Sequence, residues 1–220
     1  MNLPPSQAEI SNMLTKNNPE DAWVTAVSIA RRISPNYDPS RARMVFEDVM
    51  RLFHGEYPGY CPIKTPYHNL PHTLSVFLCA VRLTHGMHVQ GADIADDEMT
   101  MVMIATLMHD IGYAQRFEEE TGTGAQFTLS HVKRGVAFMK NYMQEHKFPE
   151  SFAQALEPIM FSTDPGVPFS QLVFPDERTR LLGKIVGAGD LTGQMADRAY
   201  LEKLLFLYLE FKEANFGNYQ

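Results

Sequence analysis

The sequence predicts an all-α, single-domain helical bundle, on three observations. Apolar residues recur every three or four positions in successive segments, as Leu201, Leu204, Leu205, Tyr208 and Phe211 do in "YLEKLLFLYLEF". Helix-start signals precede several of these segments. No segment shows the sustained apolar–polar alternation of a half-buried sheet. With 220 residues, of which 45% are hydrophobic, the chain is long enough for one domain with a substantial core.

The expected helices can be placed in order from their start signals and spacing. In "NNPEDAWVTAVSIARRI", Asn18 is the expected N-cap and Pro19 the first helical residue, and Asp38 and Pro39 repeat this arrangement before "SRARMVFEDVMRLF". The stretch "VPFSQLVF" fits a short strand or a loop leading into the next helix, and the loop is favoured. The later helices are expected at about 69–90, 96–110, 130–147, 149–162, 176–191 and 194–213.

No repeat, low-complexity tract or flexible linker divides the chain. We therefore expect N-terminal helices over about 1–60, a central core over 65–195 and a C-terminal helix over 196–220. Two polar loops, 114–128 and 162–171, either border a binding site or serve only as connectors.

Charge and hydropathy exclude several classes of protein. The net charge of −7, without a basic run, argues against a nucleic-acid polymer or an anionic membrane as partner. The longest apolar stretches, 76–81 and 101–108, fall far short of the ~20 residues of a membrane span. Cys61 and Cys79 form no CxxC pair, which favours free thiols in a reducing compartment. The N-terminus lacks a secretory signal pattern. A cytoplasmic protein is expected, with homo-oligomerisation left open.

The pair His109–Asp110 in "ATLMHDIGY" marks the first candidate for chemistry. It lies at the end of an apolar segment, just before Gly112, where a buried carboxylate and a buried imidazole both need partners. A divalent cation satisfies both groups at once, and this pair of ligand types suits Zn, Mn, Fe or Co.

Two further residues complete a possible ligand set. His72 shares a helical stripe with Val76, Cys79 and Leu83, where a lone histidine is more often a packed core residue than a ligand. Asp190 lies between glycines at the expected end of another apolar helix. Together with His109 and Asp110, these residues offer two imidazoles and two carboxylates from three helices, which is how helical domains build internal metal sites.

Three short motifs strengthen this interpretation. "YHNLPH" (67–72), "IMFSTDP" (159–165) and "GAGDLTG" (187–193) resemble signatures of the HD superfamily of metal-dependent phosphohydrolases, and in particular of the class I cyclic nucleotide phosphodiesterases. The resemblance spans about residues 65–195. It implies one or two divalent metals, with Mg²⁺ also a candidate. His72, His109, Asp110 and Asp190 would hold the first metal, and Asp110 would bridge to the second.

The same resemblance assigns roles to the neighbouring residues. His68 would be the general acid that protonates the leaving oxygen, a task to which a histidine is suited near neutral pH. Thr163 would hydrogen-bond a water held by the metal, and Tyr67 and Asn69 would orient these groups. The alternative for His68 is a solvent-facing residue at a helix start. The expected activity is hydrolysis of a small phosphate ester or phosphodiester, nucleotides included, by a metal-activated water.

The sequence departs from the family in three places. Tyr113 stands where the phosphodiesterases have a further histidine. His131, in "LSHVKRG", either lines the pocket, contacts a second metal or is a plain helix-start residue. The residues after Asp190 offer no counterpart of the family's purine-recognising glutamine region, so a cyclic nucleotide substrate is not carried over. Arg116 and Lys133 are candidate phosphate contacts near the expected mouth of the site.

Two other functions remain open at this point. Some members of the superfamily are di-iron oxygenases, but their sites generally use more histidines than this sequence offers after the HD pair. A non-catalytic module that binds metal and ligand is the other alternative, and in such a module a general acid at His68 would have no task.

Overall fold

The computed structural model describes residues 18–215 and confirms the all-α prediction. Within this range the chain forms α-helices and short 3-10 turns, and its only β pairing is an isolated bridge between Tyr60 and Arg116. The N-terminal stretch examined for a signal pattern lies outside the described residues, as do the outer ends of the 1–60 and 196–220 segments.

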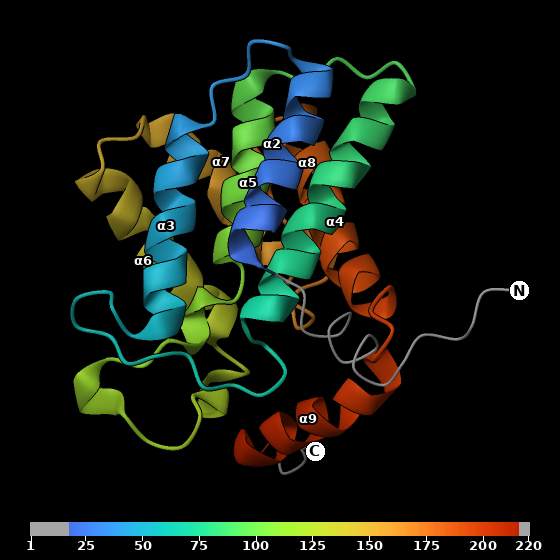
Figure 1. Cartoon of the computed structure of the whole chain (residues 1–220). Coiled ribbons are helices and arrows are strands. Elements are labelled where there is room, and N and C mark those ends of the chain that lie inside the picture. Colours follow the sequence, from blue (N-terminus) through green and yellow to red (C-terminus); the bar gives the residue numbers. More distant parts are fainter. Residues whose placement is uncertain (1–17, 216–220) are drawn as a thin grey trace, which may run out of the picture.

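Figure 1 shows the arrangement of these helices. The α-helices are α2 (Pro19–Ile33), α3 (Ser40–His54), α4 (Leu70–Val89), α5 (Asp96–Met108), α6 (His131–Glu145), α7 (Glu150–Phe161), α8 (Glu177–Met195) and α9 (Tyr200–Glu213). The 3-10 turns are η1 (Ile111–Tyr113), η2 (Phe117–Glu119), η3 (Ala125–Phe127) and η4 (Phe169–Gln171).

Asn18 caps α2 as predicted, and its Oδ1 accepts a hydrogen bond from the N–H of Glu20 at 3.0 Å. Asp38 Oδ1 accepts from the N–H of Ser40 at 3.0 Å, but Pro39 and not Asp38 is the cap residue of α3. Both side chains satisfy a backbone donor that the first turn of a helix leaves free.

Two predicted boundaries were wrong, and one ambiguity is settled. Helix α8 continues to Met195 instead of ending near 191, so Asp190 lies inside a helix and not at its end. Helix α9 begins at Tyr200 and not at 194. The stretch "VPFSQLVF" contains the turn η4 and no strand, so the loop interpretation is confirmed.

Helix α4 packs against α2, α5 and α8 (Figure 1). Its Phe77 joins Trp23 of α2 and Phe46 of α3 in an aromatic cluster, where the rings of Trp23 and Phe77 stack with centroids 6.4 Å apart. A single connected hydrophobic core contains these residues and extends to α8. Eight residues of α4 are buried in these contacts, which makes the helix a rigid support for groups at its N-terminus.

Glycines allow the close helix contacts that bring the predicted ligands together. A Cβ on Gly189 would lie 2.9 Å from the Cβ of Ala80, so α8 can approach α4 closely only with glycine there. A Cβ on Gly112 would lie 1.8 Å from the carbonyl oxygen of His131, so the same holds for η1 and α6. These two contacts place Asp190 and His131 beside the centre described below.

Cys61 and Cys79 are both free thiols, as predicted. Among residues 18–215, no helix combines the length and the apolar character that crossing a bilayer requires.

Candidate metal centre

The centre is built around the carboxylate of Asp110, which directly follows the C-cap residue of α5. Its Oδ2 lies 3.0 Å from Nε2 of His109 and 3.2 Å from Nε2 of His72, and the two nitrogens are 3.3 Å apart. All three side chains are buried. One ligand atom from each falls within 4.8 Å of the others, a separation that a single cation can span.

Asp190 adds a fourth donor from α8. Its Oδ1 lies 3.5 Å from Nε2 of His72 and 3.9 Å from Nε2 of His109. The structure therefore brings together all four residues that the sequence suggested as ligands. They come from α4, the end of α5 and α8, three elements that pack on one another.

The donor set fits a divalent cation. Oδ2 of Asp110 is buried and has no hydrogen-bond partner among the described residues, although two imidazole nitrogens lie close to it. A buried carboxylate oxygen without a partner is costly, and a cation between the converging atoms removes that cost. Two imidazoles with two carboxylates are typical of Zn, Mn, Fe or Co sites.

Backbone hydrogen bonds determine which ring nitrogen faces the centre. Nδ1 of His109 lies 2.8 Å from the carbonyl oxygen of Thr106, and Nδ1 of His131 lies 2.7 Å from that of Thr128. Because a carbonyl only accepts, Nδ1 carries the hydrogen in both rings. In the neutral ring the lone pair is then on Nε2, the nitrogen that points toward Asp110.

The close packing of carboxylates and imidazoles shifts the pKa values of the metal-free centre. Burial alone would raise the pKa of Asp110, but the neighbouring His109 and His68 outweigh it and hold that pKa well below its usual range. Burial would lower the pKa of His109, yet Asp110 and Asp190 raise it to about 9. Binding of a cation beside His109 would therefore compete with its protonation.

His131 lies on the other side of the same carboxylate. Its Nε2 is 3.5 Å from Oδ1 of Asp110, the oxygen that His72 and His109 do not approach, and burial lowers its pKa. His131 is also the first residue of α6, so this contact is made from a helix start. Asp110 thus has an imidazole nitrogen within 3.5 Å of each of its two oxygens.

Tyr113 packs against both His68 and His131. Its ring stacks on His68 at 4.8 Å with an interplanar angle of 19°, and on His131 at 4.5 Å with an angle of 15°. The two imidazole rings also lie near each other, with centroids 6.0 Å apart and planes tilted by 33°. The side chain of Tyr113 is fully buried, so the residue that departs from the family pattern supports both imidazoles by ring contacts.

His68 is bound to a residue that sequence reasoning missed. Its Nδ1 lies 2.5 Å from Oε2 of Glu210 in α9, and Oε1 of the same carboxylate accepts the backbone N–H groups of Tyr67 and His68 at 2.6 and 3.1 Å. The side chain of His68 is only 14% exposed and that of Glu210 is 0% exposed, so His68 is not a solvent-facing residue. Nothing in the sequence distinguishes Glu210 from Glu202 or Glu213 on the same helix.

Gln194 is a second missed residue, and it links Tyr67 to the ligand Asp190. The hydroxyl of Tyr67 donates to Oε1 of Gln194 at 2.8 Å, and Nε2 of Gln194 donates to Oδ1 of Asp190 at 2.9 Å. The spacing of four residues between Asp190 and Gln194 on one helix was a usable signal. The expectation that Tyr67 orients a ligand is consistent with this chain of contacts.

Asn69 caps the helix that carries His72. Its Oδ1 accepts from the backbone N–H of His72 at 3.2 Å, and its Nδ2 donates to the carbonyl of Pro66 at 2.7 Å. The cap sets the first turn of α4 and with it the direction of the His72 side chain.

For three other residues suggested as part of the site, the structure gives no contact with the four candidate ligands. The hydroxyl of Thr163 donates to the carbonyl of Met160 at 2.9 Å, at the end of its own helix α7. Lys133 is an exposed residue of α6. The guanidinium of Arg116 lies 5.7 Å from the ring centroid of Tyr60.

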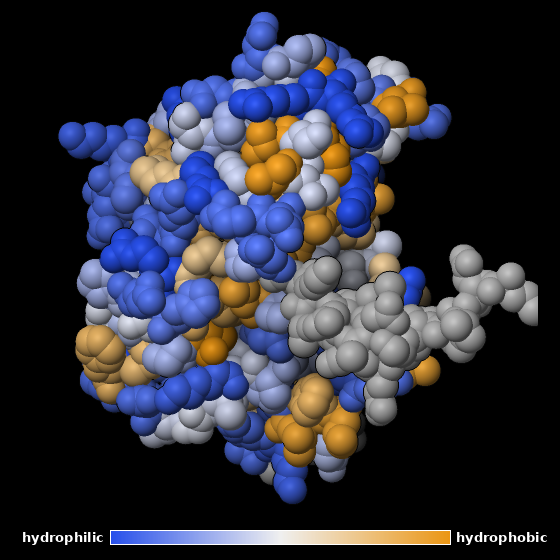
Figure 2. All heavy atoms as spheres, in the orientation of Figure 1, coloured by the Kyte–Doolittle hydropathy of each residue, from blue (hydrophilic) through white to orange (hydrophobic). Residues whose placement is uncertain are grey.

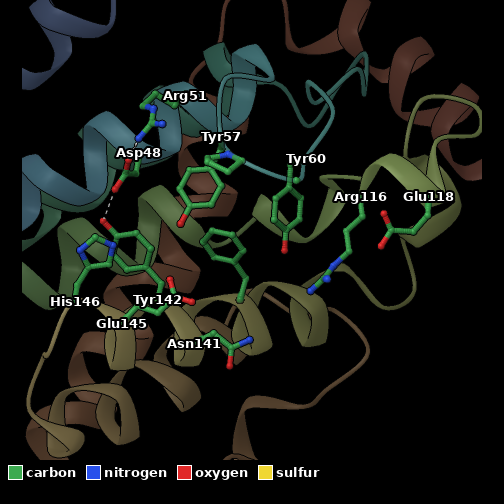
Figure 3. A pocket seen from close by; sticks show the side chains of 13 residues that line it. Asp48, Arg51, Tyr57, Tyr60, Arg116, Glu118, Asn141, Tyr142, Glu145 and His146 are labelled. Atoms are coloured by element: carbon green, nitrogen blue, oxygen red, sulfur yellow. Dashed lines mark hydrogen bonds and ion pairs between the residues drawn. The ribbon is translucent and has the colours of Figure 1, made fainter.

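Arg116 belongs to a separate pocket of about 540 Å³ (Figure 3). The rings of Tyr57, Tyr60 and Phe138 contact one another there, and Tyr142 donates to Asp48 at 2.8 Å. None of the four suggested metal ligands lines this pocket. This pocket and the candidate centre are therefore different places.

Comparison with known proteins yields one partial similarity. A family model described as Npun_R2479-like matches residues 116–219, slightly less than half of the chain. The matched part contains His131, Asp190 and Glu210 but begins after His109 and Asp110. No curated protein and no solved structure matches the chain.

Proposed function

We propose that this protein is a metal-dependent phosphohydrolase that cleaves a small phosphate ester or phosphodiester. The observation that carries the proposal is the buried, unpartnered Oδ2 of Asp110 among His72, His109 and Asp190, beside the His68–Glu210 pair. When bound, the metal supplies a Lewis acid for a phosphoryl oxygen and an activated water as nucleophile. The resemblance of the three short motifs to HD phosphohydrolases supports the same assignment.

In this proposal, His68 delivers a proton to the leaving oxygen. Its Nδ1 is held by Glu210, so Nε2 is the nitrogen that remains to act as the acid. Its ring centroid lies 5.5 Å from that of His72, which places it beside the ligands without making it one of them.

The charges around His68 favour its protonated form. Burial alone would lower the pKa of His68, but Asp110 and the hydrogen bond to Glu210 outweigh burial and raise that pKa. A bound cation offsets the charge of Asp110, so Glu210 is the partner that continues to favour the imidazolium. We therefore assign Glu210 the role of a positioning residue for His68.

The space beside His72 is lined in part by Tyr200 and Lys203 of α9. The cavity beside His72 holds only about 10 Å³, which is room for about one water molecule. Helix α9 is bound here by Glu210, and one turn further on the Glu213 carboxylate accepts the N–H and the hydroxyl of Thr123, each at 2.8 Å. Because these are a few polar contacts and not a packed apolar face, α9 is the element expected to shift when substrate enters.

The test is a hydrolysis screen of the purified protein loaded separately with Zn, Mn, Mg, Fe or Co. A phosphomonoester, a linear diester and a cyclic nucleotide serve as substrates, and Asp110→Asn serves as the metal-site variant. Turnover of at least one substrate that the variant abolishes supports the proposal. Oxygen consumption with iron and no hydrolysis would favour the oxygenase, and tight metal without any turnover would favour the non-catalytic module.

A further inference from the structure

Helix α9 presents its apolar residues to the outside. Leu201, Leu204, Leu205, Tyr208 and Leu209 form one stripe at helical spacing, and their exposed fractions are 76%, 36%, 61%, 62% and 46%. Figure 2 shows the corresponding orange surface at the lower edge of the molecule, over α9. Of the five residues whose spacing predicted this helix, Leu201, Leu204, Leu205 and Tyr208 are exposed, and Phe211 is half-buried.

The opposite face of α9 buries very little apolar surface. Glu210 is the only buried residue within the helix, and Ala214 follows just after its end. A 14-residue helix is only marginally stable without tertiary packing. The polar contacts of Glu210 and Glu213 locate α9, but its apolar stripe is left without a covering surface among the described residues.

The apolar surface is large for a monomer. At roughly 200 Å² for one large side chain, the five residues of the stripe expose roughly 560 Å², and Leu191, Met195 and Phe206 of α8 and α9 bring the exposed apolar area to roughly 900 Å². The largest patch of a typical monomer covers about 300–600 Å², whereas a standard interface buries about 800 Å² on each partner. The residues counted are Leu191, Met195, Leu201, Leu204, Leu205, Phe206, Tyr208 and Leu209.

We propose that a second copy of this chain covers the stripe, with the two α9 helices packed antiparallel about a two-fold axis. A two-fold interface uses the same patch on both subunits, and a self-complementary apolar stripe meets that requirement. In an antiparallel pair centred between Leu205 and Tyr208, Leu205 of one copy faces Tyr208 of the partner subunit.

The charges on α9 favour the antiparallel direction. Glu202 lies in the first turn and Lys212 in the last turn, and both are exposed. An antiparallel pair brings each Glu202 beside Lys212 of the partner subunit, whereas a parallel pair would bring like charges together. Complementary charges at the two ends of a helix pair favour one orientation over the other.

The interface also bears on the candidate centre, and this step rests on the proposed function. Helix α9 carries Glu210, which holds His68. Pairing of the α9 helices would keep Glu210 in place, so dissociation would weaken the positioning of His68 while leaving the four metal ligands untouched.

The test measures oligomeric state with the full chain, by light scattering and sedimentation over about 1–100 µM, a range that brackets a micromolar Kd. We expect a dimer for the wild type and dissociation for Leu205→Asp, with Kd raised at least tenfold, since a charge would be buried in the apolar interface. Val173→Asp is the matched control, because Val173 is 87% exposed and lies outside α8 and α9. It should remain dimeric.

A charge reversal tests the direction of packing. Glu202→Lys alone should weaken the dimer, and adding Lys212→Glu should restore it. A wild type that stays monomeric throughout, as it would if residues 1–17 covered the stripe, overturns the proposal, and so does a dimeric Leu205→Asp. Failure of the double reversal overturns the antiparallel arrangement. These readouts do not depend on turnover, so they remain decisive if the proposed hydrolase activity is absent.

Discussion

Nδ1 of His68 lies 2.5 Å from Oε2 of Glu210, although the two residues are 142 positions apart in the sequence. The same carboxylate accepts two backbone N–H groups from the turn that precedes α4. One buried side chain of α9 therefore fixes both the position of this turn and the orientation of the imidazole that it carries. Positioning carboxylates of this kind set which nitrogen of a histidine carries the proton.

Glu210→Gln should lower turnover of an alkyl phosphate ester by roughly tenfold or more, because His68 loses the charge that favours its protonated form. A nitrophenyl ester should lose much less, since its leaving group is a stable anion. Metal content should not change. Glu213→Gln, on the same helix but bound to Thr123, is the control. Equal losses on both esters would show that Glu210 only holds the structure together.

His68→Ala should reduce turnover of the alkyl ester by about 10²–10⁴-fold, the usual range for general acid–base catalysis. The nitrophenyl ester should again be far less affected, and bound metal should remain. Comparable losses on both substrates would mean that His68 positions the metal or the substrate without donating a proton. Unchanged turnover on both would contradict any role in the reaction.

Asp110→Asn should abolish metal binding, because the amide replaces the carboxylate that both imidazoles face. Chelation should then lower the Tm of the wild type and leave that of the variant unchanged. A ligand at 100 times its Kd stabilises the folded state by about 2.7 kcal/mol. Asp97→Asn, at an exposed carboxylate of α5, is the control and should behave as the wild type. Full metal content in Asp110→Asn, measured by elemental analysis, would refute the assignment.

Gly112→Ala should destabilise the fold by about 3 kcal/mol, at the upper end of the range for overpacking. Its Cβ would overlap the carbonyl of His131 at 1.8 Å, and the start of α6 would have to move. Gly86→Ala is the matched control, because no atom lies within 4 Å of a Cβ there and the residue is inside α4. That change should stabilise by about 0.5–1 kcal/mol. Urea unfolding of both variants measures the contrast.

Arg134→Gln should destabilise the fold by about 2 kcal/mol. The guanidinium donates to the carbonyls of Gly112 and Ala114 at 2.9 and 3.0 Å and to both oxygens of Glu119, and thereby holds the turn that follows Asp110. Lys133→Gln, at the neighbouring exposed position, should change stability by less than about 0.5 kcal/mol. Urea unfolding at pH 7 compares the two variants with the wild type.

The effect of Arg134→Gln should also depend on pH. The hydrogen bond from Arg134 lowers the pKa of Glu119 from its usual 4.5 to about 2. The stabilisation from this pair is therefore complete above pH 4.5 and is lost as the pH falls toward 2. The difference in unfolding free energy between wild type and variant should shrink over that interval. A difference that stays constant would show that the backbone contacts alone account for it.

Much of the fold, and the four residues that meet at the candidate centre, could be predicted from the sequence. Helix starts such as Asn18–Pro19 are local, since the capping side chain bonds a backbone group two residues away. His109 and Asp110 are adjacent, and His72 shares a short motif with Asn69. These residues could therefore be suggested as metal ligands without knowledge of the fold. The end of α8 was misplaced because the glycines around Asp190 resemble a helix stop, whereas they serve the close contact with α4.

The sequence by itself determined the helices and the residue types of the centre, because helical spacing, caps and short motifs act over a few residues. Only the tertiary structure decided that Glu210 is the partner of His68, that Tyr113 packs against two imidazoles, and that the stripe of α9 faces outward. Periodicity shows that a helix has an apolar face but not which surface covers it. That choice depends on packing between segments distant in the chain, and in α9 the turn before α4 binds the carboxylate of Glu210 and leaves the leucines exposed.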